Sequence, residues 1–99
     1  MVYQIIFKKR FKNKLEKLLI HLEGEFGILI AQRFAGQLNH KFLILQQQPS
    51  IGKQSISFSN IRSIKAGKHN RLYYRVEGST IVVLNMYDTR INPAKNRMQ

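Results

Sequence analysis

The chain has 99 residues, of which 43% are hydrophobic, and its 17 lysines and arginines against 5 acidic residues give a formal net charge of +12. It contains no cysteine, which excludes disulfides, thiolate nucleophiles and cysteine-based zinc sites. This length suits one domain with one core, and such a positive charge indicates a polyanion or an acidic protein as partner. We therefore expect a single domain over residues 1–99, with residues 94–99 frayed.

The N-terminal segment argues against export and against membrane insertion. Its apolar residues precede its first basic cluster, which is the opposite of the order in a secretory signal. No apolar run approaches the length that spans a bilayer. We expect a soluble cytoplasmic protein with no membrane partner.

The first half of the chain has one strand pattern followed by a helix pattern. Residues 2–7 are rich in β-forming side chains, which predicts a strand. Apolar residues then recur at spacings of three and four over residues 11–26, which indicates an amphipathic helix. Asn13 and Glu16 have the spacing of a capping box at its start, and Gly27 suits a left-handed cap at its end.

A second amphipathic helix follows at once. Its apolar face covers residues 30–45, and Pro49 ends it because the residue before a proline is pushed into an extended conformation. The joint at Gly27 is short, so the two helices must form an antiparallel hairpin.

The second half has the pattern of strands. Residues 50–54 are expected to be a loop, residues 55–65 an irregular strand, and residues 66–70 a basic turn. Residues 71–76 and 80–87 are β-rich and are separated by a short glycine-containing turn, which predicts a hairpin.

Alternation along a strand assigns the two faces of this hairpin. In its first strand we expect Leu72, Tyr74 and Val76 to face the core, with Arg71, Tyr73 and Arg75 on the other face. In its second strand we expect Val82, Leu84 and Met86 to face the core, opposite Ile81, Val83, Asn85 and Tyr87. The predicted fold class is α+β, in the order β-α-α-β-β-β, with a small, mainly antiparallel sheet and the helical hairpin packed on one face.

Few residues suit catalysis by metals or by a nucleophilic side chain. The carboxylates are too sparse for a two-metal nuclease, and the chain has neither a GxSxG elbow nor a glycine-rich phosphate loop. We expect no metal and no cofactor.

Basic and aromatic residues gather instead in the last third of the chain. Arginine binds phosphate bidentately and tyrosine stacks on bases. The residues expected to bind nucleic acid are Arg62, Lys65, Lys68, Arg75, Tyr73 and Tyr87. Such a surface can cleave RNA without metal if the 2′-hydroxyl attacks and cations stabilise the phosphorane.

His69 is the one histidine of this basic region and is the candidate acid or base. Each of these residues also has a simpler interpretation. His69 can form a structural hydrogen bond in a loop, Tyr73 can pack on the sheet, and the arginines can line a solvated strand face.

Three motifs carry a family resemblance. They are Gln-Pro-Ser-Ile-Gly at residues 48–52, Lys-His-Asn-Arg-Leu-Tyr-Tyr-Arg-Val at 68–76, and Tyr-Asp-Thr-Arg-Ile-Asn-Pro at 87–93. With the element order, they resemble the RelE/ParE toxin superfamily of type II toxin–antitoxin modules, also described as plasmid stabilisation proteins, over about residues 1–95. The resemblance implies a cytoplasmic toxin held inactive by an acidic or amphipathic segment of a cognate antitoxin.

The resemblance leaves the target open. RelE-like members are mRNA interferases that cut messenger RNA in the ribosomal A site, and their two catalytic arginines match Arg71 and Arg90, with Arg62 and Lys65 as matches for basic strand residues. Their C-terminal tyrosine has no counterpart after Tyr87, so His69 or Tyr87 would have to replace it. ParE-like members instead poison DNA gyrase without catalysis. A third alternative is a non-toxic basic module that binds nucleic acid.

Overall fold

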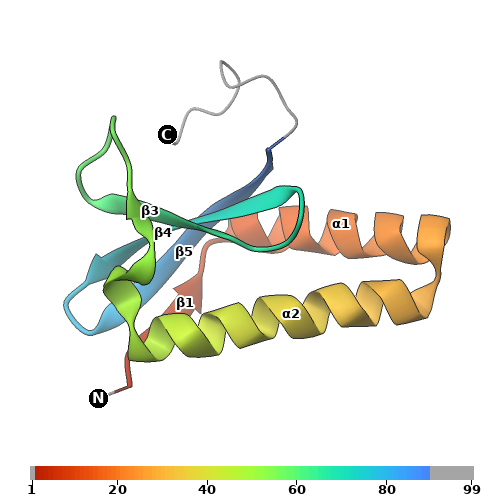
Figure 1. Cartoon of the computed structure of the whole chain (residues 1–99), viewed down its shortest axis with the longest axis horizontal. Helices are drawn as coiled ribbons and strands as arrows, with labels where there is room; N and C mark the ends of the chain where they lie inside the picture. The colour runs from red at the N-terminus through yellow and green to blue at the C-terminus, as the bar shows by residue number, and fades with distance from the viewer. Residues whose placement is uncertain (1, 90–99) are drawn as a thin grey trace.

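Five strands form one mixed sheet in the order β1–β5–β4–β3–β2 in the computed structural model, which describes residues 2–89 (Figure 1). β1 runs parallel to β5, and the other neighbours are antiparallel. The elements are β1 (Gln4–Phe7), α1 (Lys9–Phe26), α2 (Ile28–Gln47), the 3-10 turn η1 (Pro49–Ile51), β2 (Lys53–Gln54), β3 (Ile61–Lys65), β4 (Asn70–Glu77) and β5 (Thr80–Asp88).

The predicted α+β class and the helical hairpin on one face of the sheet are confirmed. Gly27 ends α1 as expected, and its N–H donates to the Glu23 carbonyl oxygen at 2.9 Å, but its φ of 91° and ψ of 167° differ from the left-handed cap that was predicted. The capping box at Asn13 is wrong, because α1 already begins at Lys9. The helix starts early because the Lys8 N–H bonds the Val83 carbonyl at 2.9 Å, so the chain turns directly out of β1.

The core lies between the helices and the sheet. Three aromatic rings join β1, α1 and α2, with centroid distances of 5.6 Å for Phe7–Phe11, 5.0 Å for Phe7–Phe42 and 6.0 Å for Phe11–Phe42. Leu38 and Leu45 of α2 are buried against the same cluster. The apolar stripes therefore pack on the sheet in the first part of α1 and the second part of α2, whereas Phe26 and Ile30, on either side of Gly27, are exposed.

The face assignment for β4 is confirmed, but that for β5 is wrong over its first half. Leu72 and Tyr74 lie in the helix-facing core, together with Ile81, Val83 and Met86 of β5. Val82 and Leu84 lie on the opposite face in a second cluster with Ile61 and Tyr73. A register shift between Tyr73 and Tyr74 leaves Leu84 as an extra residue, and this bulge reverses the alternation before it.

The strand expected over residues 55–65 is shorter, and a strand was missed before it. β3 begins at Ile61, while Lys53 and Gln54 form β2 beside it, where a loop was expected. The Ser55 hydroxyl accepts hydrogen bonds from the N–H groups of Ser57 at 3.2 Å and Phe58 at 3.1 Å. A serine that bonds its local backbone in this way competes with strand pairing, so residues 55–60 form a loop.

Candidate functional site

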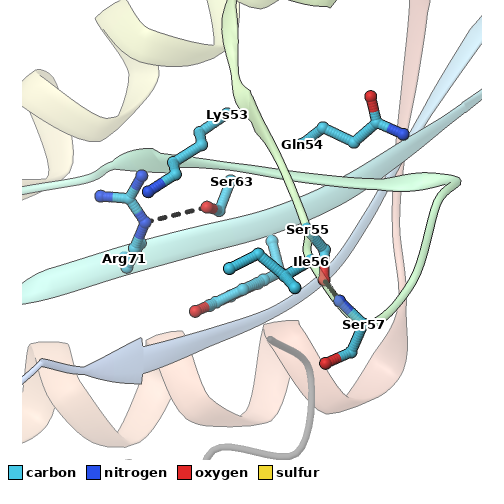
Figure 2. Close-up of a pocket in the computed structure, with 8 residues that line it drawn as sticks. Lys53, Gln54, Ser55, Ile56, Ser57, Ser63 and Arg71 are labelled. Atoms are coloured by element: carbon cyan, nitrogen blue, oxygen red, sulfur yellow. Dashed lines mark hydrogen bonds between the residues drawn. The ribbon is translucent and has the colours of Figure 1, made fainter.

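A hollow of about 410 Å³ lies on the sheet face that points away from the helices (Figure 2). We call it the Arg71 hollow. It is lined by Lys53, Gln54, Ser55, Ile56, Ser57, Ser63, Arg71 and Tyr73. These lining residues include two cations and no acid, so the hollow is positively charged.

The floor of the Arg71 hollow is a buried apolar layer. Tyr73 is 4% exposed and packs with Val82 and Leu84 in the second cluster. Its ring meets Tyr87 edge to face at a centroid distance of 5.5 Å. The bulge at Leu84 therefore shapes this floor, because it turns Leu84 towards Tyr73 and away from the helices.

Arg71 is held in place by a neighbouring strand. Its Nε donates to the Ser63 hydroxyl at 2.8 Å, and Ser63 is buried opposite Tyr73 on β3. Figure 2 shows the Lys53 amino group reaching from β2 towards the Arg71 guanidinium. A guanidinium fixed through Nε still presents its terminal N–H groups, and an adjacent ammonium adds charge, so the pair suits a phosphate.

The other predicted basic strand residues lie elsewhere. Arg62 points to the helix side, where its Nη1 donates to the carbonyl oxygens of Ser50 at 3.2 Å and Gly52 at 2.8 Å. Arg75 shares the face of Arg71 but forms an ion pair with Glu77. In this structure Arg62 therefore braces the segment before β3, and Arg75 already has an acidic partner.

The turn between β3 and β4 carries the remaining basic candidates. Lys65 pairs in register with Arg71, and Lys65 and Lys68 border a second hollow against α2. His69 is half-buried, its carbonyl accepts the Thr89 N–H at 2.8 Å, and it does not line the Arg71 hollow. Arg90 and residues 94–99, for which fraying was predicted, lie outside the described residues.

Tyr87 has a cationic neighbour that sequence reasoning missed. The Nζ of Lys14 in α1 lies 3.9 Å from the centre of the Tyr87 ring and donates to the Met86 carbonyl at 3.3 Å. Burial, with a smaller effect of nearby Arg10, lowers the pKa of Lys14. Asn85 also donates from Nδ2 to the Tyr87 hydroxyl at 3.1 Å. Tyr87 is thus fixed in position by two neighbours.

Lys53 and Ser63 were missed as well. Ser63 lies two residues before Lys65, so strand alternation could have placed it on the face of Arg71. Lys53 gave no such signal, because its two-residue strand has no recognisable pattern.

Neither a metal centre nor a membrane segment is found in residues 2–89. No three histidine, aspartate or glutamate side chains of this described part come together to hold a metal ion. The same residues contain no helix long and apolar enough to cross a membrane.

Solved structures with the same fold include proteins of toxin–antitoxin systems. The chromosomal ParDE system of Pseudomonas aeruginosa matches with a TM-score of 0.74 at 15% identity, covering 88% of this chain and 96% of that one. The RelBE2 toxin–antitoxin complex of Mycobacterium tuberculosis matches with a TM-score of 0.64 at 21% identity, covering 89% of this chain and 99% of that one. The YoeB/ParE toxin of Agrobacterium tumefaciens matches with a TM-score of 0.62 at 15% identity, covering 86% of this chain and 96% of that one.

The fold is therefore that of the RelE/ParE class of toxins from type II toxin–antitoxin systems. No curated protein matches the chain significantly in sequence. The family model described as the ParE toxin of the type II toxin–antitoxin system parDE matches residues 5–93, and the chain belongs to this family of toxins.

Proposed function

We propose that this toxin is a ribosome-dependent mRNA endonuclease that uses a metal-free basic surface. The observation that carries the proposal is the Arg71 hollow, which Arg71 and Lys53 line above an apolar floor without an acidic residue in the lining. Two cations that line one hollow are stabilised by a bound anion, and a phosphodiester is the anion that RNA presents.

The cleavage follows from the chemistry of RNA itself. The 2′-hydroxyl oxygen bonds to the neighbouring phosphorus as the bond from phosphorus to O5′ breaks, which leaves a 2′,3′-cyclic phosphate and a 5′-hydroxyl. One group accepts the 2′-hydroxyl proton and another protonates O5′. Arg71 and Lys53 stabilise the extra negative charge of the phosphorane. His69 is our candidate for a proton transfer, and Arg90 for a third cation.

The test is cell-free translation with the purified toxin, with message ends mapped by primer extension. We expect ribosome-dependent cuts at codon boundaries, and we expect Arg71→Ala to slow cutting by about a hundredfold or more, as loss of one transition-state charge partner does. Arg33→Ala is the matched control, because it removes an exposed arginine from α2 instead. Equal cutting by Arg71→Ala and Arg33→Ala would contradict the assignment.

A second candidate function is inhibition of DNA gyrase without catalysis. It is favoured by one observation, namely that neither a histidine nor a carboxylate lines the Arg71 hollow to move protons. A supercoiling assay with purified gyrase decides between the two. Blocked supercoiling with intact messages, at toxin concentrations that arrest growth, selects gyrase.

We further propose that an acidic or amphipathic antitoxin segment neutralises the toxin in the cytoplasm. The net charge of +12 favours such a partner, and similar folds occur in toxin–antitoxin complexes. Co-purification of the toxin with the product of a neighbouring short reading frame, and recovery of growth when both are expressed, test this pairing. Growth arrest that persists in the presence of that product excludes it as the antitoxin.

A further inference from the structure

The proposed mechanism leaves a second hollow unused. It lies between α2 and the turn that joins β3 to β4 and has a volume of about 570 Å³. We call it the α2 hollow. It is lined by Gly36, Gln37, His40, Lys41, Lys65, Ala66, Gly67 and Lys68. The lining combines three lysines and a histidine with no acidic residue.

The cations of the α2 hollow are carried by elements that are fixed against each other. Ala66 of the turn is 1% exposed, and its N–H donates to the Asn70 carbonyl at 2.9 Å. A Cβ on Gly67 would lie 3.2 Å from Cε1 of Phe34, so the turn rests directly on α2. The backbone that carries Lys65 and Lys68 is therefore fixed against α2, which reduces the entropy lost when a ligand binds.

Gly36 forms part of the wall of the α2 hollow. It lies inside α2, where glycine is less favourable than alanine by about 1 kcal/mol. A Cβ at this position would meet nothing within 4 Å, so no neighbour requires its absence. The bare backbone of Gly36 lines the α2 hollow and lets a ligand come close to the helix.

We infer that the α2 hollow binds the phosphate backbone of RNA, as a second contact distinct from the Arg71 hollow. Lysine ammonium groups act as point charges for phosphates and do not select bases, so this contact is independent of sequence. Three lysines without an acidic residue in the lining favour a ligand that carries repeated negative charges, as the RNA backbone does. The inference rests on the proposed function only in taking RNA as the ligand.

The test is binding of the full-length toxin to a fluorescently labelled single-stranded RNA over a range of salt concentrations, without ribosomes. Gly36→Glu places a carboxylate among the lysines, and we expect it to weaken binding about tenfold and to flatten the salt dependence. Gly24→Glu is the matched control, because Gly24 is an interior glycine of α1 that also has nothing within 4 Å. It lowers the net charge equally, and we expect less than about a twofold change.

A double variant, Lys41→Ala with Lys68→Ala, checks the inference without adding an acid. Removing two phosphate contacts should lower the slope of log affinity against log salt by about 1.4. Equal effects of Gly36→Glu and Gly24→Glu, or an unchanged slope in the double variant, would overturn the inference. So would a Gly36→Glu variant that binds RNA normally but loses an acidic protein partner.

The outcome is separable from that of the cleavage assay. If messages stay intact in cell-free translation while RNA binding still depends on Gly36, the endonuclease proposal fails and the α2 hollow remains a binding site. If cutting depends on Arg71 while Gly36→Glu binds RNA like Gly24→Glu, the endonuclease proposal stands and the α2 hollow is not an RNA site.

Discussion

The two faces of the sheet are built from alternate residues of the same strands, yet they differ in what they leave open. On the helix side, Leu72 and Tyr74 are completely buried and the Tyr74 hydroxyl is hydrogen bonded. On the other side, Tyr73 is buried beside Arg71, whose guanidinium borders an open hollow. Neighbouring residues of β4 thus have different roles, because one side chain packs in the core and the next lies on the face with the open hollow. One short strand therefore contributes to both the core and the candidate site. Substitutions on the two faces should therefore separate stability from activity.

The largest loss of stability is expected from truncation of the helix-side core. Leu45→Ala removes a side chain that is 0% exposed, and we expect the free energy of unfolding to fall by about 2–5 kcal/mol because a cavity is left behind. Urea unfolding monitored by circular dichroism measures this loss in the free energy of unfolding. Leu43→Ala on the same helix is the control, since Leu43 is 53% exposed and should change stability by less than about 1 kcal/mol.

A smaller loss is expected from Tyr74→Phe. The Tyr74 hydroxyl donates to the Pro49 carbonyl at 2.7 Å and accepts the Gly52 N–H at 2.9 Å, so its removal leaves both groups unpaired. We expect a cost of about 1–3 kcal/mol in urea unfolding at neutral pH. A variant as stable as the wild type would show that water replaces the hydroxyl.

The pH dependence of Tyr74 sharpens this test. Burial raises its pKa above the ordinary value of 10.0, although the Gly52 hydrogen bond and nearby Arg62 oppose the change. The folded state therefore keeps the hydroxyl proton above the pH at which the unfolded state loses it. The stability that the Tyr74 hydroxyl contributes is present below pH 10.0 and declines as pH rises through the raised pKa. The difference in free energy of unfolding between the wild type and Tyr74→Phe should therefore narrow over this pH range.

Arg71→Ala should change stability less than either substitution above. Its hydrogen bond to Ser63 lies at the rim of a half-open hollow, so we expect a loss of about 1 kcal/mol or less. RNA cutting should nevertheless be abolished in the translation assay described above. A loss of stability as large as that of Leu45→Ala would show that Arg71 is mainly a structural residue.

The smallest effect is expected from the ion pair between Arg75 and Glu77. The two side chains are 31% and 54% exposed, and exposed pairs contribute about 0–1 kcal/mol. Glu77→Gln should lower stability by no more than that, and the difference should shrink at high salt. A difference that persists in high salt would indicate a contact other than the ion pair.

Most of the fold was readable from periodicity, and the errors arose where local geometry overrides it. The helices and the β4–β5 hairpin have long, regular patterns that survive tertiary packing. The faces of Val82 and Leu84 could not be predicted from alternation. A single extra residue at the bulge inverts the alternation, and composition does not reveal such a residue. Residues 55–60 contain β-forming side chains, but the Ser55 hydroxyl holds them in a loop.

The site could be predicted only in part. Arg71 on the open face followed from alternation and from the family resemblance, whereas its partners depend on strand pairing across the sheet. Lys53 lines the hollow of Arg71 because the two-residue β2 pairs with β3, and Lys14 contacts the Tyr87 ring from α1, 73 residues earlier in the chain. Arg62 faces the helix side because its register with Tyr74 places it there, which strand composition alone does not reveal.

The parallel pairing of β1 with β5 has a consequence for how the toxin is made. Gln4 pairs with Thr80 and Phe7 with Val83, so within residues 2–89 the sheet neighbour of β1 is β5, which follows it by more than seventy residues. Contacts between segments so distant in sequence form late, because a long loop must close first. A growing chain therefore cannot complete this sheet until β5 has been translated.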